Sequence, residues 1–503
     1  MNNNTRSEPP VPDTSASSAA ASASWGELFD RRNIWRALAL TGGVALHAIN
    51  VHIVTTILPS VVRDIGGLDY YAWNITLFVA ASIVGSALTS KLLDLLGARP
   101  TYLLALLVFV AGSLICAAAP QMLWMLAGRS VQGLGGGLLA ALGYALIRVV
   151  FAPRLWSRAV ALVSGMWGIA TLLGPAVGGI FAESGNWRLA FWALLPVALL
   201  QALIVTMQLR GRGTAPVTGG SLPAFRIALL TASVLAIALA GQVQEPLWQI
   251  GGIVIGVLLA VWMARLDSRM RRAGATTVFP KGTYQPGSVM GKLFACVALL
   301  TIATTTEIFV PYFLQVIHGQ PPLLAGYMTA AMAGGWSAAS LISSGRSGAS
   351  ADRMVRSGPL IMAMALLALG VLLPQPPDLS PLLPWLQVLA LAGAGLGVGL
   401  GWPHLLTRVL QSAERGEENL ASSSITTAQL YAMAVGAALA GVAANGAGLV
   451  QPGGVEGAQM AARWLFAVFA AAPLLAAWLT RGLSRQLARS SAAQRSRTVE
   501  QGR

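Results

Sequence analysis

The stretch KLFACVALLTIATTTEIFVPYFLQVI, residues 292–317, contains only two charged side chains, Lys292 at its start and Glu307 inside it. A helix needs about 20 apolar residues to cross a hydrocarbon core of about 30 Å, so this stretch is long enough to span a membrane. Glu307 is the exception within it, because no Lys or Arg lies within ten residues on either side. Charged groups inside a membrane are costly and commonly mark a functional site.

Apolar runs of this kind recur along nearly the whole chain. Of the 503 residues, 55% are hydrophobic and only 10% are charged, against about 25% charged in ordinary soluble proteins. Runs this long predict membrane-spanning helices, since a β-barrel would show short alternating segments. We therefore expect an all-α polytopic membrane protein with 14 transmembrane helices. They are predicted at roughly 36–60, 71–93, 100–119, 122–150, 157–182, 188–208, 226–243, 247–265, 292–317, 322–344, 358–374, 382–408, 420–446 and 462–480.

The net charge of +15 is unevenly distributed over the predicted loops. With the N-terminus in the cytoplasm, the outer loops receive only Arg63, Arg188 and Arg463, and Arg129 lies within a span. All other basic residues fall on the cytoplasmic side, as the positive-inside rule requires. This distribution favours the lipid bilayer over a nucleic acid as the partner of the basic residues, and predicts that both termini are cytoplasmic.

The chain contains an internal repeat. When it is shifted by 260 residues, GLGGGLLAALGYALIRVV (133–150) lies over GAGLGVGLGWPHLLTRVL (393–410). This predicts two pseudo-symmetric six-helix halves of parallel orientation, with a substrate path at their interface. The expected division is a disordered cytoplasmic tail (1–35), an N-terminal bundle (36–208), a linker with two extra helices and a cytoplasmic loop (209–291), a C-terminal bundle (292–480) and a basic cytoplasmic tail (481–503).

The sequence offers little for catalysis or cofactor binding. Cys116 and Cys296 both lie inside apolar runs, and the four histidines are scattered. Neither a nucleotide-binding GxxxxGK[ST] loop nor an HExxH zinc motif occurs. We therefore expect no enzyme, no cofactor, no metal site and no ATP-driven transport, and we assign no catalytic residue.

Four stretches resemble segments of the major facilitator superfamily, and within it the fourteen-helix drug:proton antiporters. SKLLDLLGARP (90–100) resembles the loop that locks the cytoplasmic gate, with matches at Asp94, Gly97 and Arg99. LAGRSVQGLGGG (126–137) is similar to a helix whose arginine is linked to proton transfer. The matching residues there are Arg129 and Gln132. The resemblance covers about residues 36–480.

The third stretch, GIATLLGPAVGG (168–179), resembles the antiporter signature. Its matching residues are Gly174, Pro175, Gly178 and Gly179. Glycines give a helix face that another backbone can approach closely, and proline bends a helix. Close packing without any mechanistic role is the alternative. The fourth stretch, FVPYFLQVIHGQPPLLAGYM (309–328), resembles the first hairpin of the C-terminal half in fourteen-helix exporters. NWRLAFW (186–192) and ILPSVVRDIGG (57–67) are also similar to segments of this subgroup.

The first helix departs from the subgroup at Asn50, where many members carry an aspartate. Asparagine cannot carry a proton, so a proton-coupled chain needs another titratable group. Glu307 is the first candidate, at a similar depth in the pseudo-equivalent helix, and it could also serve as counter-charge for a cation. His47 is the second candidate, because imidazole titrates near neutral pH. His52 is expected to project from another side of the helix.

A structural role for Glu307 is the alternative, with hydrogen bonds from Thr304, Thr305 or Thr306. Arg129 likewise has a purely structural alternative. Polar and aromatic residues within the spans are candidates for lining a cavity. They are Asn74, Trp167, Tyr312, Gln315, Tyr327, Trp336 and Gln429.

The resemblance implies a secondary active transporter that moves small amphipathic compounds, cationic ones among them, out of the cell by alternating access and proton antiport. A facilitator, or an exporter of an endogenous metabolite with different coupling, is the alternative. We expect a monomer in the cytoplasmic (inner) membrane, with a small-molecule substrate and protons as its partners.

Overall fold

The computed structural model describes residue 27 and residues 30–152, 155–209, 223–243, 245–414 and 417–483. Every regular element in this part of the chain is helical. Most of the predicted N-terminal tail, part of the linker and most of the C-terminal tail lie outside the described residues. Helix α2 begins at Arg31, within the segment expected to be disordered.

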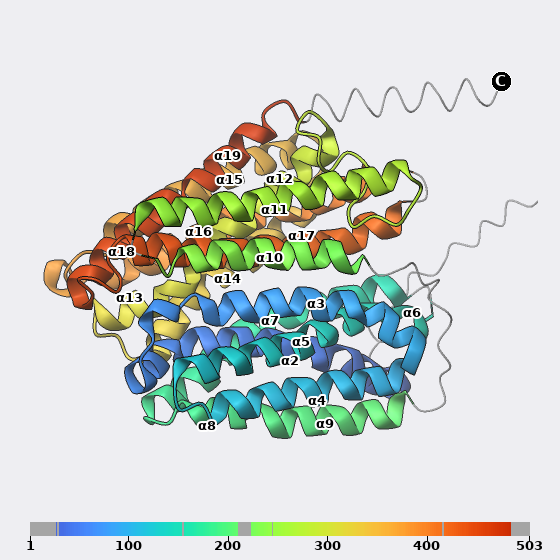
Figure 1. Ribbon diagram of the computed structural model, residues 1–503, viewed down its shortest axis with the longest axis horizontal. Coiled ribbons are helices and arrows are strands. Elements are labelled where there is room, and N and C mark those ends of the chain that lie inside the picture. The colour runs from blue at the N-terminus through green and yellow to red at the C-terminus, as the bar shows by residue number, and fades with distance from the viewer. Residues whose placement is uncertain are drawn as a thin grey trace, which may run out of the picture.

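The helices form two groups that lie side by side (Figure 1). The first comprises α2 (Arg31–Ile65), the short 3₁₀ helix η1 (Leu68–Tyr70), α3 (Trp73–Leu96), α4 (Ala98–Ala117), α5 (Met122–Ala145), α6 (Ile147–Val150), α7 (Trp156–Glu183), α8 (Arg188–Trp192) and α9 (Leu194–Gln208). The second comprises α12 (Val289–Thr304), η3 (Thr305–Phe309), α13 (Val310–Val316), α14 (Pro322–Ser344), α15 (Gly348–Leu372), η4 (Pro377–Leu379), α16 (Leu383–Gln411), α17 (Glu418–Gly446), α18 (Gly454–Phe469) and α19 (Ala471–Thr480). Between them in the chain come α10 (Ala224–Ala240) and α11 (Pro246–Arg272).

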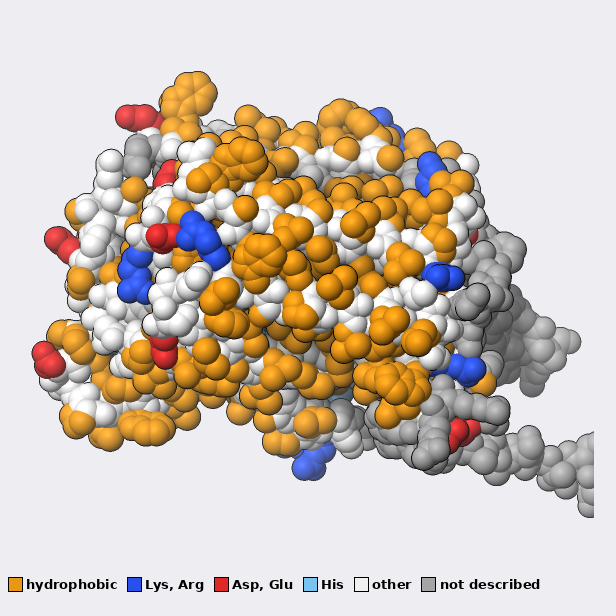
Figure 2. All heavy atoms as spheres, turned by 90° about the horizontal axis from the view of Figure 1, so that it is seen from below, with side chains coloured by type: hydrophobic (Ala, Val, Ile, Leu, Met, Phe, Trp, Pro, Cys, Tyr) orange, Lys and Arg blue, Asp and Glu red, His pale blue; other side chains and the backbone are white. Residues whose placement is uncertain are grey.

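Eleven stretches in the described part of the chain are long and apolar enough to cross a membrane. Helices α5 and α14, of 24 and 23 residues, are not among them, and α10 is apolar but shorter, with 17 residues. Figure 2 shows a wide hydrophobic face with charged side chains gathered mainly at its two ends. The chain is therefore a multi-pass membrane protein.

Glycine seams hold each group together. A Cβ on Gly133 of α5 would lie 2.2 Å from the carbonyl oxygen of Phe78 in α3, and one on Gly135 would lie 2.4 Å from the backbone nitrogen of Phe109 in α4. Helix α16 packs in the same way: its Gly395 lies against α14, and its Gly397 lies against α15. The absence of side chains lets these backbones approach closely.

The structural repeat differs in register from the sequence repeat. The letters align Gly133 with Gly393. In the structure, however, a Cβ on Gly393 would meet only the Cβ of Ala365 at 3.5 Å, whereas Gly395 makes the contact equivalent to that of Gly133. The position equivalent to Gly133 is therefore Gly395, two residues after the one given by the sequence alignment. The alignment is ambiguous because both runs contain several glycines, which can be matched in more than one register.

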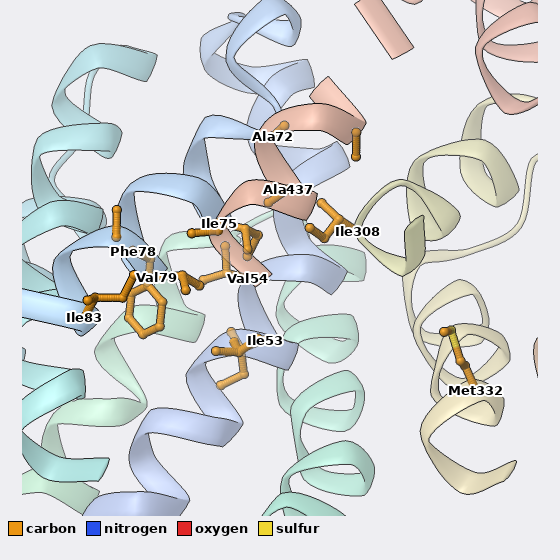
Figure 3. Close-up of a cluster of buried hydrophobic side chains, with 14 of the residues drawn as sticks. Ile53, Val54, Ala72, Ile75, Phe78, Val79, Ile83, Ile308, Met332 and Ala437 are labelled. Atoms are coloured by element: carbon orange, nitrogen blue, oxygen red, sulfur yellow. The ribbon is translucent and has the colours of Figure 1, made fainter. Parts of the chain in front are cut away.

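The two groups meet through α7 against α14 and through α3 against α17. Figure 3 shows Val54 of α2, Ile75 of α3 and Ala437 of α17 within one cluster of buried apolar side chains, with Ile308 of η3 beside them. At one end of this interface the Asn445 side-chain amide donates to the carbonyl oxygen of Asp69, at 3.0 Å. Apolar packing and a side-chain-to-backbone hydrogen bond thus join the groups.

Helices α10 and α11 pack on each other, and α10 also contacts α17 and α3. A buried ion pair fixes their ends, with Arg226 donating to Asp267 at 2.5 Å. Asp267 also accepts from the Val278 and Phe279 backbone N–H groups and from the Tyr284 hydroxyl. A buried carboxylate needs such partners, and here they order the loop before α12.

Candidate functional site

Glu307 lies in η3, a short 3₁₀ segment between α12 and α13. Its side chain is half-buried and forms no hydrogen bond or ion pair with any described residue. The predicted threonine partners are wrong. The hydroxyls of Thr304, Thr305 and Thr306 donate to the carbonyl oxygens of residues 301, 302 and 303 of their own helix. Threonine in a helix commonly bonds back to the preceding turn, which leaves the carboxylate without these donors.

The carboxylate faces a small cavity where α2, α7, η3–α13 and α14 meet. Its lining includes His52, Thr56, Pro175, Glu307, Gly326 and Thr329. The cavity volume is about 10 Å³, close to the space that one water molecule needs. We call this space the Glu307 cavity. It lies on the interface between the two helix groups, so any movement of one group against the other changes it.

Histidine 52, rather than His47, shares this cavity with Glu307. Its Nε2 atom lies 3.5 Å from the Thr171 hydroxyl of α7. His47 is buried elsewhere, between Phe78 at 5.2 Å and Trp167 at 5.8 Å between ring centroids. His52 does project from another side of α2 than Asn50, as expected, because Asn50 faces Gln132 of α5 whereas His52 faces α7.

Asn50 belongs to a second polar cluster, centred on Gln132. The Gln132 side-chain oxygen accepts from Asn50 at 3.3 Å and from Arg129 at 2.5 Å. The Gln132 amide donates to the Ser113 hydroxyl at 2.8 Å, and Arg129 also donates to the carbonyl oxygen of Asn74 at 3.1 Å. The structure thus brings together Asn50, Arg129 and Gln132, three of the predicted residues, but not at Glu307.

Arg129 is fully buried and forms no ion pair with a described carboxylate. Its guanidinium carbon lies 4.0 Å from the centre of the Phe78 ring, a cation–π contact. One of its terminal nitrogens has no hydrogen-bond partner. The positive charge in the middle of the first helix group is therefore only partly compensated.

The glycines of the GPxxGG stretch contact two different helices. A Cβ on Gly174 would lie 2.3 Å from the Cβ of His52 in α2, and Gly178 also faces α2. Gly179 faces α14, where its Cβ would lie 2.5 Å from the Cα of Leu323. Next to it, a Cβ on Gly326 would lie 2.9 Å from the Cβ of Pro175. This α7–α14 contact closes the interface directly beside the Glu307 cavity.

Helix α7 is packed differently at its other end. Gly165, Trp167, Gly168 and Ile169 are exposed, and a Cβ on Gly165 or Gly168 would meet no atom of a described residue within 4 Å. By contrast Gly174, Pro175, Gly178 and Gly179 are buried. The same helix therefore seals the interface at its C-terminal end and leaves open space beside its N-terminal end.

The predicted gate residues lie at the turn from α3 to α4. Gly97 adopts φ 85°, a left-handed conformation that favours glycine. Asp94 is exposed, and neither Asp94 nor Arg99 forms an ion pair with a described residue. In the second group, by contrast, Asp352 of α15 forms an ion pair with Arg408 of α16.

The predicted lining residues are dispersed. Asn74 is buried and donates to the backbone carbonyl oxygens of Tyr70 and Tyr71, just before α3. Tyr312 packs on Tyr71, with ring centroids 5.4 Å apart, and Trp336 packs on Trp402 at 5.0 Å. The remaining ones range from exposed to half-buried and form no hydrogen bond among the described residues: Gln315, Tyr327 and Gln429.

Two of the family-like segments meet at the end of α2. The Trp187 indole donates to Asp64 at 3.0 Å, and Arg188 donates to the same oxygen at 2.6 Å. Asp64 belongs to ILPSVVRDIGG, and Trp187 and Arg188 belong to NWRLAFW. The opposite charges of Asp64 and Arg188 were the sequence feature from which this contact could have been predicted.

No group of three or more potential metal ligands occurs among the described residues.

A polytopic helical fold of two helix groups, with a carboxylate at their interface that has no partner among the described residues, is the arrangement expected of a membrane transporter. A sequence model of the Major Facilitator Superfamily matches residues 40–437, and the chain belongs to this superfamily.

Named relatives are similar over most of the chain. A probable multidrug-efflux transporter of Mycobacterium tuberculosis (strain ATCC 25618 / H37Rv) is 37% identical over 94% of this chain and 99% of its own length. The multidrug transporter protein MdtP of Bacillus subtilis (strain 168) is 27% identical, over 77% of this chain and 72% of its own length.

Solved structures share the fold at low identity. A POT family transporter in complex with a thioalcohol-conjugated peptide aligns with a TM-score of 0.65 and 13% identity, covering 89% of this chain and 96% of its own. A bacterial homologue of the human lysosomal transporter Spinster, in an inward-facing and occupied conformation, aligns with a TM-score of 0.59 and 14% identity, over 90% and 97% of the two chains.

Proposed function

We propose that this protein exports small amphipathic compounds, cationic ones among them, by alternating access in exchange for protons. The observation that carries the proposal is the Glu307 carboxylate, which has no partner among the described residues and faces a small cavity between the two helix groups. The names of the relatives, multidrug-efflux and multidrug transporters, support export of such compounds.

The carboxylate can serve two ligands that exclude each other. When ionised it attracts a lipophilic cation, and when protonated it does not. A carboxylate inside a membrane protein is stable only when it is neutral or paired. Release of the cation therefore favours uptake of a proton, and proton release favours binding of the next cation, which is the exchange that antiport requires.

The open and closed ends of α7 support alternating access. Contact at Gly179 and Leu323 closes one end of the interface, and space beside Gly165 and Gly168 leaves the other end open. The open end is the one that the basic residues assign to the cytoplasm. In this proposal the structure represents the inward-open state, and the α7–α14 contact breaks when the opposite side opens.

The proposed architecture has fourteen transmembrane helices. Eleven stretches qualify by length and apolarity, and α5, α14 and α10 complete the set in this proposal. Residues 36–208 and 292–480 would then be two six-helix halves, joined through the linker 209–291. We further propose that both termini are cytoplasmic, that the membrane is the inner membrane of a bacterium, and that the monomer is the functional unit.

The second candidate function is a facilitator or a differently coupled exporter of an endogenous metabolite. It is favoured by Asn50, which occupies the position of the usual aspartate and cannot hold a proton. The two functions differ in what a proton gradient does, because a facilitator equilibrates its substrate and does not concentrate it.

The test uses reconstituted vesicles with an acid interior and ethidium, a permanent cation, outside. Molecules inserted with their cytoplasmic face outward should concentrate ethidium inside the vesicles, and collapse of the gradient should abolish the accumulation. Glu307→Gln should lose it, whereas Glu456→Gln, a change at an exposed carboxylate of α18, should retain it. Equilibration of ethidium that ignores the gradient would contradict the proposal and favour the second candidate.

A further inference from the structure

His52 and Glu307 approach the same water-sized space from different helix groups. His52 lies on α2 and Glu307 on η3, and both line the Glu307 cavity of about 10 Å³. So small a space leaves room for about one water molecule between them. The two side chains therefore face one small space, in which a water molecule can exchange protons with either of them.

The hydrogen bonding of His52 indicates which ring nitrogen can accept that proton. The Thr171 hydroxyl donates to the Trp167 carbonyl oxygen at 2.9 Å, so its oxygen can only accept from His52 Nε2, at 3.5 Å. A neutral imidazole carries one N–H. With the hydrogen on Nε2, Nδ1 is the basic atom, and it forms no hydrogen bond with a described residue.

Other helices around the cavity add no competing charge. The lining residues of α7 and α14 are Pro175, Gly326, Thr329 and alanines, and none of them titrates. Helix α17 meets η3 through Gly436, whose Cβ would lie 2.6 Å from the Thr305 hydroxyl. Glu307 and His52 are therefore the two titratable groups of this cavity.

We propose that His52 and Glu307 together form one shared proton site, which is complete only while the α7–α14 contact is closed. The inference rests on the proposed proton antiport and assigns its second residue. One bound proton gives either a carboxylic acid beside a neutral imidazole or a carboxylate beside an imidazolium. Loss of that proton leaves a carboxylate beside a neutral imidazole, the state that can bind a cation.

The geometry also links this site to the conformational change. A Cβ on Gly174 would lie 2.3 Å from the Cβ of His52, so α7 and His52 are in direct backbone-to-side-chain contact. Separation of α7 from α14 draws α2 away from η3, opens the cavity to water and removes the second proton position. On that side Glu307 alone takes up a proton after the cation has left, and closure of the contact then returns the imidazole as a second position, from which the proton leaves to the cytoplasm.

The test is the pH profile of gradient-driven ethidium transport for His52→Gln. Titratable groups that interact within one small cavity titrate as a coupled pair, so removal of the imidazole should move the profile to lower pH by about one unit while transport persists. His404→Gln, at a histidine outside the cavity, should leave the profile in place. Thr171→Val keeps the imidazole but removes its acceptor, and should shift the profile in the same direction by less.

Three outcomes decide the inference. A shift in both His52→Gln and Thr171→Val supports the shared site, and if His52→Gln does not fold, the Thr171→Val profile decides alone. An unchanged profile in these variants, with coupling lost in Glu307→Gln, overturns the shared site but leaves proton antiport standing. Wild-type transport that ignores the proton gradient overturns both.

Discussion

Gly179 of α7 lies against Leu323 of α14 so closely that a Cβ on the glycine would stand 2.5 Å from the leucine Cα. The carboxylate of Glu183, one turn further along α7, accepts a hydrogen bond from the Leu323 backbone N–H at 3.0 Å. The interface between the helix groups is therefore closed at this point by backbone contact, next to the cavity that holds Glu307.

Replacing Gly179 by alanine should slow transport. The methyl group would meet the α14 backbone, and overpacking of this kind costs about 1–3 kcal/mol, which disfavours the closed contact. Gly168→Ala is the matched control, because its Cβ would meet no atom within 4 Å, and alanine is the better helix former. Uptake rates of the two variants in vesicles measure the effect. Equal rates would show that the α7–α14 contact is not part of the transport cycle.

Replacing Gln132 by leucine should destabilise the protein. Arg129 and Asn50 would lose the oxygen that both donate to, and unsatisfied buried groups of this kind cost about 3 kcal/mol. The thermal unfolding midpoint in detergent should fall clearly. Gln429→Leu, at a half-buried side chain with no hydrogen bond to a described residue, should change it little. An unchanged midpoint for Gln132→Leu would mean that the cluster does not stabilise the fold.

Stability should depend on pH through Glu417, just before α17. Burial pushes the pKa of Glu417 up, but the Lys281 backbone N–H and the Arg271 side chain outweigh this and hold the pKa below its ordinary value of 4.5. A carboxyl with a lowered pKa stabilises the folded state above its ordinary pKa and loses that contribution as the pH falls through the folded-state value.

Glu417→Gln should therefore lower the unfolding midpoint at neutral pH, by the equivalent of about 1 kcal/mol. The difference from wild type should shrink below about pH 4.5. Glu414→Gln breaks only the exposed ion pair with Lys281, which contributes little. A difference between Glu417→Gln and wild type that stays constant across this range would rule out an electrostatic role for Glu417.

The sequence predicted the features that depend on local composition. Long apolar runs predicted the membrane-spanning helices. Glu307 was identified as a candidate because it is a lone carboxylate within one of these runs. The glycines of the GPxxGG stretch were expected to permit close approach, and Gly174 and Gly179 do contact other helices closely. These features can be predicted from the sequence because each depends on the residues of a single helix.

Features that depend on which helices are neighbours could not be predicted in the same way. His52 was not chosen as a candidate because the cavity that it lines is formed with residues of α7 and α14, which lie far away in the chain. The threonines beside Glu307 were assigned to it by proximity in sequence, although their hydroxyls return to the backbone of their own helix. The repeat was displaced by two residues because glycine runs match in several registers.

The most direct test of the account is proton release on substrate binding. Purified protein in weakly buffered detergent solution would be mixed with ethidium, and the pH change recorded for wild type and for Glu307→Gln. The account predicts that wild type releases protons as the cation binds, and that Glu307→Gln releases none. Equal proton release from both proteins would contradict it, because the proton displaced by the cation would then not come from Glu307.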